Sequence, residues 1–213
     1  MRMSAEIRWF WAGCPPPSFA AWFRAAGPSW GGASDSKTRT DEYLRDPAQT
    51  TLGIKRRGGS QGLEIKGLIS TRPTSLALAG CACRIGLWGK WSAAFALDAG
   101  RLIKVAKQRW MRKFEVGGGT VRELAATESF ERSSGCDAEL TLLEGPDGTP
   151  WWTVGFEAFG AFDQVEDDLT ATVAVMQRRA PPPLPAGLAA AIRAGLLRKR
   201  GECSGVSILA YCG

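Results

Sequence analysis

The sequence predicts an α+β protein in which antiparallel β-strands dominate and a few helices pack outside them. Three observations support this class. Short runs of β-favouring residues follow one another closely, with Gly, Pro, Asp or Ser between them. Charged and apolar side chains alternate within most of these runs, and helical periodicity is confined to three short regions. We expect one domain over residues 1–180, followed by a C-terminal helix and a tail over residues 181–213.

The N-terminal part of the chain predicts a strand, a short helix and three closely spaced strands. Residues 6–11 favour β-structure and are followed by a run of three prolines. Ser18 is a candidate helix N-cap, because aromatic residues recur at helical spacing directly after it. The turn residues that separate the next three runs indicate antiparallel hairpins. These strands are expected at residues 38–44, 51–57 and 62–69.

The rest of the chain predicts four more strands and two helices. The strands are expected at residues 87–97, 102–116, 137–143 and 150–159. Residues 70–83 are ambiguous, whereas the Pro146-Asp147-Gly148 turn indicates a hairpin between the last two strands. Apolar residues recur at helical spacing from Val165 to Met176, with acidic residues near the N-terminus of that helix. A second short helix is expected at residues 187–200.

Composition narrows the chemistry available to the protein. The net charge of +6 favours acidic partners, although Arg198, Lys199 and Arg200 supply half of it. The chain has no His, so any catalysis must use carboxylates, Lys, Arg, Cys or a bound metal. The six cysteines lack the paired spacing of a zinc site, which favours small reduced thiols. No run resembles an export signal or a membrane span, so we expect a cytoplasmic protein.

Strand after strand carries one apolar face and one charged face. Side chains two residues apart in a strand point the same way, so Glu6 and Arg8 share a face opposite Ile7 and Trp9. The same argument groups further charged residues on the later strands. These are Lys55 with Arg57, Glu64 with Lys66, Lys107 with Arg109 and Lys113, and Asp137 with Glu139. On a single strand, such a face is most simply the wet side of an antiparallel sheet.

Taken together, the charged faces suggest a different arrangement. If the sheet closes into a barrel with these faces inward, it encloses a cavity lined by cations and a few carboxylates. Buried charges are costly without partners, so such a cavity must hold water or an anionic ligand. A polyphosphate with a divalent cation suits this lining, because Lys and Arg bind phosphoryl oxygens and carboxylates bind Mg²⁺ or Mn²⁺.

The order of these segments resembles that of the CYTH superfamily, the triphosphate tunnel metalloenzymes. The resemblance covers about residues 4–180. It is carried by SAEIR at 4–8, TDEYL at 40–44, LGIKRR at 52–57, LEIK at 63–66, KQR at 107–109, AELT at 138–141 and GFE at 155–157. The chain departs from the family pattern in its opening ExExK motif, where Ser4 replaces the first Glu and Arg8 replaces the Lys. The final ExE is also incomplete, because Gly155 or Phe159 takes one of its places.

The resemblance implies a tunnel-like antiparallel β-barrel with helices packed outside, and it implies roles for individual residues. The implied metal ligands are Glu6, Glu139 and Glu157, for Mg²⁺ or Mn²⁺. The expected phosphate contacts are Arg8, Lys55, Arg57, Lys66, Lys107, Arg109 and Lys113. The expected partner is a small phosphorylated or polyphosphate ligand.

Three functions follow as alternatives. The first is metal-dependent hydrolysis of a triphosphate, and the second is binding of a phosphorylated ligand without hydrolysis. The third is nucleic-acid binding by an exposed basic face, with Trp88, Trp91 or Trp110 stacking on bases. Acidic residues interleaved with the basic ones count against the third.

Overall fold

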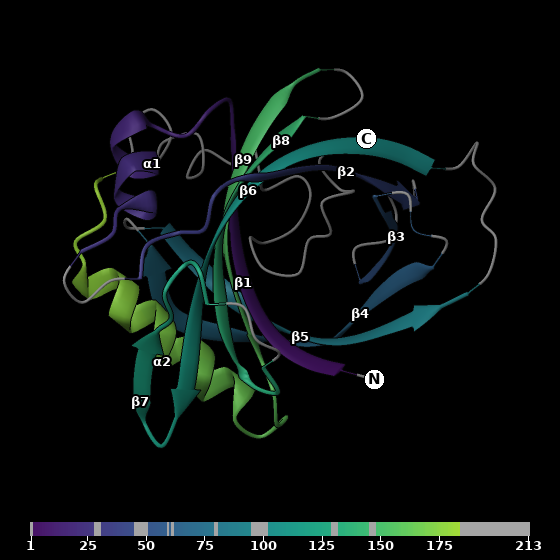
Figure 1. The fold of residues 1–213 in the computed structure, drawn as a ribbon. Coiled ribbons are helices and arrows are strands. Elements are labelled where there is room, and N and C mark those ends of the chain that lie inside the picture. Colours follow the sequence, from purple (N-terminus) through teal and green to yellow (C-terminus); the bar gives the residue numbers. More distant parts are fainter. Residues whose placement is uncertain are drawn as a thin grey trace.

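A computed structural model of the chain describes residues 2–27, 31–44, 51–58, 60, 62–78, 81–94, 102–128, 132–144 and 148–183. These residues form nine β-strands and two α-helices (Figure 1). The elements are β1 (Arg2–Ala12), α1 (Pro17–Arg24), β2 (Lys37–Leu44), β3 (Leu52–Arg57), β4 (Leu63–Leu78), β5 (Cys81–Ala93), β6 (Leu102–Gly117), β7 (Thr120–Glu123), β8 (Gly135–Glu144), β9 (Pro150–Phe159) and α2 (Val165–Arg178).

Eight strands close into an antiparallel barrel. Their order around the wall is β2-β3-β4-β5-β1-β9-β8-β6, and β6 pairs with β2 to complete the ring. Strand β7 lies outside the ring, paired only with β6 among the described strands. The predicted antiparallel β-barrel is therefore confirmed, within a described fold that is mainly β.

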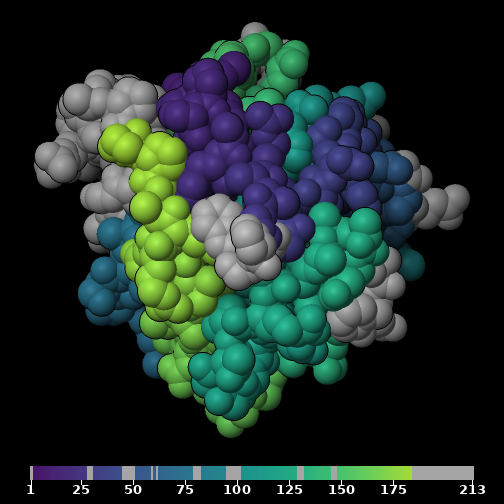
Figure 2. Space-filling view, turned by 60° about the vertical axis from the view of Figure 1, so that its left-hand side comes forward, coloured from purple at the N-terminus to yellow at the C-terminus, as the bar shows by residue number. Residues whose placement is uncertain are grey.

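The helices cover one side of the barrel, and the main apolar core lies between them and the wall. Alternate residues of β1, such as Ile7 and Trp9, point out of the barrel and are fully buried beneath α1 and α2. Outward-facing Trp152 and Phe156 of β9 join the same core. Figure 2 shows α2, in yellow-green, lying along the surface beside the teal β6–β7 hairpin. Because the apolar faces of β1 and β9 are buried on the outside of the barrel, the charged side chains at the alternate positions of these strands point into it.

A second, smaller apolar cluster lies inside the barrel. Phe10, Tyr43, Val105 and Leu143 pack together, with Ile103 and Trp151 against them. On β1, β6, β8 and β9 these residues occupy the alternate positions from those in the outer core, so their side chains point inward. Tyr43 of β2 is the cross-strand partner of Ile103 and points the same way. One part of the barrel interior is therefore filled by apolar side chains, and the charged residues gather in the remainder.

Strands β4 and β5 differ in extent from the strands expected from the sequence, and β7 is not among the expected strands. Residues 70–83, which show no period, continue β4 to Leu78 and open β5 at Cys81. Register shifts after Leu68 and Pro73 explain the lost alternation, because an extra residue in one strand reverses the face of those that follow. Strand β5 ends at Ala93 rather than at residue 97, and its partners are β4 and β1.

The two described helices match the predicted positions, with one local difference. The N-cap of α1 is Pro16 and no side chain caps the helix, so the expectation that Ser18 is the cap is wrong. Ser18 instead follows Pro17 in the first turn, where proline is well tolerated. Helix α2 carries Glu166, Asp167 and Asp168 in its first turn, as expected. The helix expected at 187–200, the tail and the Pro146-Asp147 turn lie outside the described residues.

A buried ionic cluster ties the helices to the outer strand. Arg112 of β6 donates to the carbonyl oxygen of Phe23, in the last turn of α1, and to that of Ala25 just after the helix, and it pairs with Glu123 of β7. Glu123 also pairs with Arg179, one residue past α2, at 2.5 Å. Both Arg112 and Glu123 are only 1% exposed. Neither described helix is long and apolar enough to cross a bilayer.

Candidate anion-binding cavity

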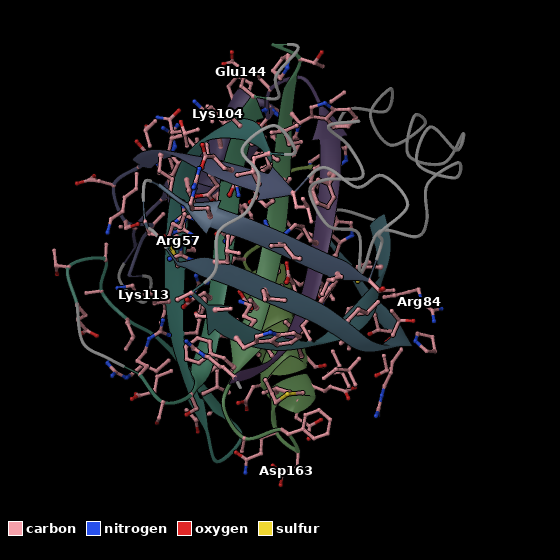
Figure 3. All side chains as sticks on the ribbon, turned by 90° about the vertical axis from the view of Figure 1, so that its right-hand side faces the viewer. Arg57, Arg84, Lys104, Lys113, Glu144 and Asp163 are labelled. Atoms are coloured by element: carbon pink, nitrogen blue, oxygen red, sulfur yellow. The ribbon has the colours of Figure 1, made fainter. Side chains whose placement is uncertain are left out.

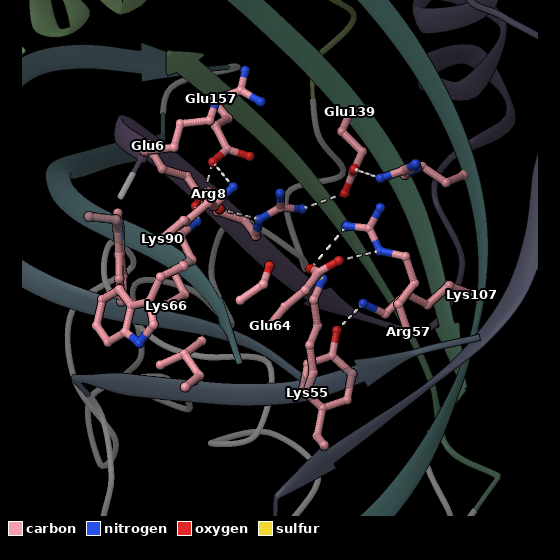
Figure 4. A pocket seen from close by; sticks show the side chains of 18 of the residues that line it. Glu6, Arg8, Lys55, Arg57, Glu64, Lys66, Lys90, Lys107, Glu139 and Glu157 are labelled. Carbon is pink, nitrogen blue, oxygen red and sulfur yellow. Dashed lines mark hydrogen bonds and ion pairs between the residues drawn. The ribbon is translucent and has the colours of Figure 1, made fainter. Parts of the chain in front are cut away.

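The barrel encloses a cavity of about 420 Å³, a size typical of small-molecule sites (Figure 4). All eight barrel strands contribute to its wall. The charged lining residues are Arg2, Glu6, Arg8, Arg39, Lys55, Arg57, Glu64, Lys66, Lys90, Lys107, Arg109, Glu139 and Glu157. Nine are Lys or Arg and four are Glu, which gives a formal excess of five positive charges.

Two of the glutamates, Glu6 and Glu157, face each other across the β1–β9 pair in direct register. Two lysines compensate their charges. Lys66 pairs with Glu6 and lies 3.6 Å from Glu157, and Lys90 pairs with Glu157. Burial alone would raise the pKa of Glu157, but Lys66 and Lys90 outweigh burial and hold that pKa well below its usual range. Both acids are therefore ionised and matched by ammonium groups.

Arg8 bridges acids on two different strands. Its Nε donates to Glu6 Oε1 at 2.9 Å, and its Nη1 donates to Glu139 Oε1 at 3.0 Å. The same Nη1 also donates to Thr153 Oγ1 at 3.0 Å. Burial alone would lower the pKa of Arg8, but Glu139 and Glu6 raise it above its ordinary value. The guanidinium is a permanent cation held between two carboxylates.

Gly155 of β9 makes room for this bridge. It is the cross-strand partner of both Arg8 and Glu139, so the guanidinium must pass over it to reach the acid. A Cβ at this position would lie 2.6 Å from Arg8 Cζ and 2.7 Å from its Nη2. No side chain fits there while Arg8 keeps its place. The space above Gly155 is thus filled by the guanidinium of Arg8.

Glu139 is also held from its other side. Arg109 Nη1 lies 2.9 Å from Glu139 Oε2, and Thr141 donates to Oε1 at 2.7 Å. Burial would raise the pKa of Glu139, but the charges of Arg8 and Arg109 hold it well below the usual range. The carboxylate is ionised at neutral pH and fixed by two guanidinium groups.

Lys107 and Asp41 form the most buried charged pair of the site. Asp41 is fully buried and Lys107 is 7% exposed, with 3.1 Å between Nζ and Oδ2. Lys107 also donates to the Tyr43 hydroxyl, where the cavity meets the apolar cluster. Burial, and then the positive charge of Lys55, lower the pKa of Lys107 to about 8, although Asp41 acts in the opposite direction.

The more open side of the cavity carries Glu64 between two cations. Lys55 Nζ lies 3.0 Å from Glu64, and Arg57 Nε lies 2.7 Å from it. The Arg57 side chain is 48% exposed, so this group meets solvent. Its ion pairs are correspondingly weak, and an entering anion can compete for both cations.

Comparison of the sequence with protein-family models and with curated proteins finds no match.

The structure brings together nine of the ten residues that sequence reasoning selects. Arg8, Lys55, Arg57, Lys66, Lys107 and Arg109 line the cavity, and so do Glu6, Glu139 and Glu157. Lys113 does not. Its ammonium donates to the carbonyl oxygen of Glu128 at 3.0 Å (Lys113 is labelled in Figure 3).

The cavity also contains charged residues that the sequence argument leaves out of the site, among them Arg2, Arg39 and Lys90. Lys90 follows Trp88 at a spacing of two on β5, so the alternation argument could have found it. Trp88 itself is buried with Lys66 5.0 Å above its ring, and Trp110 packs against the outer core. Of the three tryptophans considered for base stacking, only Trp91 is exposed.

The three glutamates implied as metal ligands do not fit a divalent cation as they are arranged here. A metal site needs several oxygen ligands turned toward one point. Each of these carboxylates is instead engaged by Lys or Arg, and Arg8 lies between Glu6 and Glu139. Within the described part of the chain, no three acidic or Cys side chains group closely enough to hold an ion.

Proposed function

We propose that the protein binds a small polyanionic phosphorylated ligand, such as a triphosphate or polyphosphate, inside the barrel. The observation that carries the proposal is the convergence of nine Lys and Arg side chains on one cavity with only four Glu. This arrangement also supports the resemblance to triphosphate tunnel proteins, which we retain as part of the proposal.

The charge imbalance calls for an anion. Asp41 does not line the cavity itself, but it pairs with Lys107, which does. Counting its charge reduces the excess of five positive charges to four. Unmatched charges in a partly enclosed space cost free energy unless water or a counter-ion compensates them. A phosphate monoester carries about −1.5 to −2 charges, so a ligand with two or three phosphoryl groups would neutralise most of the excess.

The Lys and Arg side chains of the cavity are also suitable donors for phosphoryl oxygens, both in their chemistry and in their positions around the cavity. Arg8 and Arg109 approach from β1 and β6, and Lys55, Lys66 and Lys90 from β3, β4 and β5. A guanidinium has five N–H donors, so one that holds a carboxylate oxygen retains donors for a ligand. The ion pairs with the four glutamates keep these side chains in place before the ligand enters, which lowers the entropic cost of binding.

The same placement argues against nucleic acid as the ligand. Non-specific binding to a duplex or a single strand uses a basic face or an open groove with accessible aromatic side chains. Here the cations point into the barrel and alternate with carboxylates, and Trp88 is only 5% exposed. A small anion that enters the barrel matches this geometry better.

Isothermal titration with sodium tripolyphosphate tests the proposal. The unmodified protein is expected to bind, and Arg109→Gln is expected to weaken binding about 10- to 100-fold, because a hydrogen bond to a charged group contributes about 1.5–3 kcal/mol. Arg122→Gln is the matched control: it removes one positive charge from an exposed ion pair with Glu115, away from the cavity. Equal weakening in both variants, or no binding by the unmodified protein, would refute the proposal.

The alternative use of the cavity is hydrolysis of the triphosphate with Mg²⁺ or Mn²⁺, which would require Glu6, Glu139 and Glu157 to exchange their present partners for a metal. The release of phosphate from tripolyphosphate separates hydrolysis from binding alone. Release above that of a Glu6→Ala, Glu157→Ala double variant would support the enzyme, and binding without such release would support the binding protein.

A further inference from the structure

We infer that the Arg8 guanidinium occupies the place of a divalent cation between the carboxylates, so that the cavity takes its phosphorylated ligand free of metal. This inference rests on the proposed function and specifies the class of ligand. It concerns how the four inward carboxylates are neutralised, which decides whether a metal complex or a free anion binds better in the cavity.

The first support is the position of Arg8. Its guanidinium joins Glu6 of β1 to Glu139 of β8 at 2.9 and 3.0 Å, and it spans the intervening strand β9 to do so. A bound Mg²⁺ or Ca²⁺ would bring carboxylates from neighbouring strands together in a comparable way, because such ions require several oxygen ligands at once. Arg8 therefore supplies the positive charge that these carboxylates need, by hydrogen bonding rather than by coordination (Figure 4).

The second support is that the wall is shaped for this side chain. Gly155, opposite both Arg8 and Glu139, leaves open the path that the guanidinium takes, and a Cβ there would lie 2.6 Å from Arg8 Cζ. Thr153, fully buried two residues earlier on the same strand, accepts a third hydrogen bond from Arg8. Strand β9 therefore offers Arg8 both a hydrogen-bond acceptor, at Thr153, and the space for its guanidinium, at Gly155.

The third support is that the remaining carboxylates are also matched by cations. Glu157 pairs with Lys90 and lies 3.6 Å from Lys66, and Lys55 and Arg57 hold Glu64. A divalent ion entering the cavity would have to displace at least one of these cations against an excess of four positive charges, with Asp41 counted. A metal-bound phosphate brings less negative charge than the free anion, so it gains less from the same lining.

Calorimetric titration under three conditions tests the inference. Tripolyphosphate is titrated into the protein in EDTA and, separately, in excess MgCl₂ at matched ionic strength; MgCl₂ and MnCl₂ are also titrated alone. We expect binding in EDTA, binding about tenfold weaker or more in excess Mg²⁺, and no heat from either metal alone. Tripolyphosphate binding that requires Mg²⁺ would overturn the inference and leave the proposed function standing. An absence of tripolyphosphate binding under every condition would overturn both.

Variants at residue 8 provide an independent readout that needs no phosphorylated ligand. Arg8→Met removes the guanidinium and leaves Glu6 and Glu139 short of one cation, so Mn²⁺ is expected to raise the melting temperature of this variant. The unmodified protein and Arg8→Lys, which keeps a positive charge, are expected to show no such rise. A rise in the melting temperature of the unmodified protein on addition of Mn²⁺ would contradict the inference, and that measurement does not depend on whether Arg8→Met folds.

Discussion

Lys107 and Asp41 form a buried ion pair, 3.1 Å long, across the contact between β6 and β2 that closes the barrel. The pair links the fold to the site. Asp41 belongs to the wall and is fully buried, whereas the Lys107 ammonium reaches the cavity between Tyr43 and Lys55. Loss of the charge on Lys107 would therefore affect both barrel closure and the field inside the cavity.

The affinity for tripolyphosphate should fall as the pH rises from 7 to 9. Burial and the neighbouring Lys55 place the pKa of Lys107 at about 8, so its ammonium form predominates at pH 7 and is largely lost by pH 9. An anion stabilises the charged form and raises this pKa, so binding near pH 8 should take up protons. Calorimetry in buffers of different ionisation enthalpy measures that uptake.

The control for this pH dependence is Lys107→Gln, which should bind more weakly at pH 7 but show a flatter profile between pH 7 and 9. An unmodified protein whose affinity is constant over this range, or which releases protons on binding, would show that Lys107 does not contribute its charge to the site.

Gly155→Ala should destabilise the protein although alanine is normally the better strand residue. The new Cβ would collide with Arg8 Cζ, 2.6 Å away, and forcing the guanidinium aside should cost about 1–3 kcal/mol in the free energy of unfolding. Urea denaturation measures the change. Gly117→Ala on β6 is the control, because a Cβ there meets no atom within 4 Å. Equal effects of the two substitutions would contradict the account of the Arg8 bridge.

Arg112→Met should destabilise the fold without altering the cavity. Arg112 is 1% exposed and pairs with Glu123 outside the barrel, so its removal leaves a buried carboxylate with one fewer cation. Breaking a buried pair from one side costs about 3–5 kcal/mol. The free energy of unfolding in urea should fall by that order, while the affinity for tripolyphosphate of the folded fraction should be unchanged.

Arg122→Gln serves as the comparison for this prediction. Its ion pair with Glu115 is more than half exposed, so the change in stability should stay within about 0.5 kcal/mol. An Arg112→Met protein as stable as Arg122→Gln would show that the buried cluster contributes nothing to the docking of β7 and the helices.

Much of the fold and the composition of the site could be predicted from alternation along the strands. The spacing of two that groups Glu6 with Arg8, or Lys107 with Arg109, holds wherever a strand is regular, because one face is committed to the apolar core. Prediction from alternation failed between residues 70 and 83, where irregular pairing of β4 with β5 interrupts the spacing of two. Alternation gives the face of a residue and no more.

Position along a strand and pairing between strands could not be obtained in this way. Lys113 has the same parity as Lys107, but it lies roughly 20 Å further along β6, where the carbonyl oxygen of Glu128 accepts a hydrogen bond from its ammonium. The partners of Arg8 depend on the register of β1, β9 and β8, which brings Glu139 to it across 131 residues of sequence. Gly155 is informative only once that register is known.

The central claim is that the inward-facing cations form one anion site, and a crystal structure of the complex with tripolyphosphate tests it most directly. The account predicts density for the ligand inside the barrel, within hydrogen-bond distance of Arg109, Lys55 and Lys66. Density bound only to the outer surface, for example near Arg122, with the interior ion pairs unchanged, would contradict it.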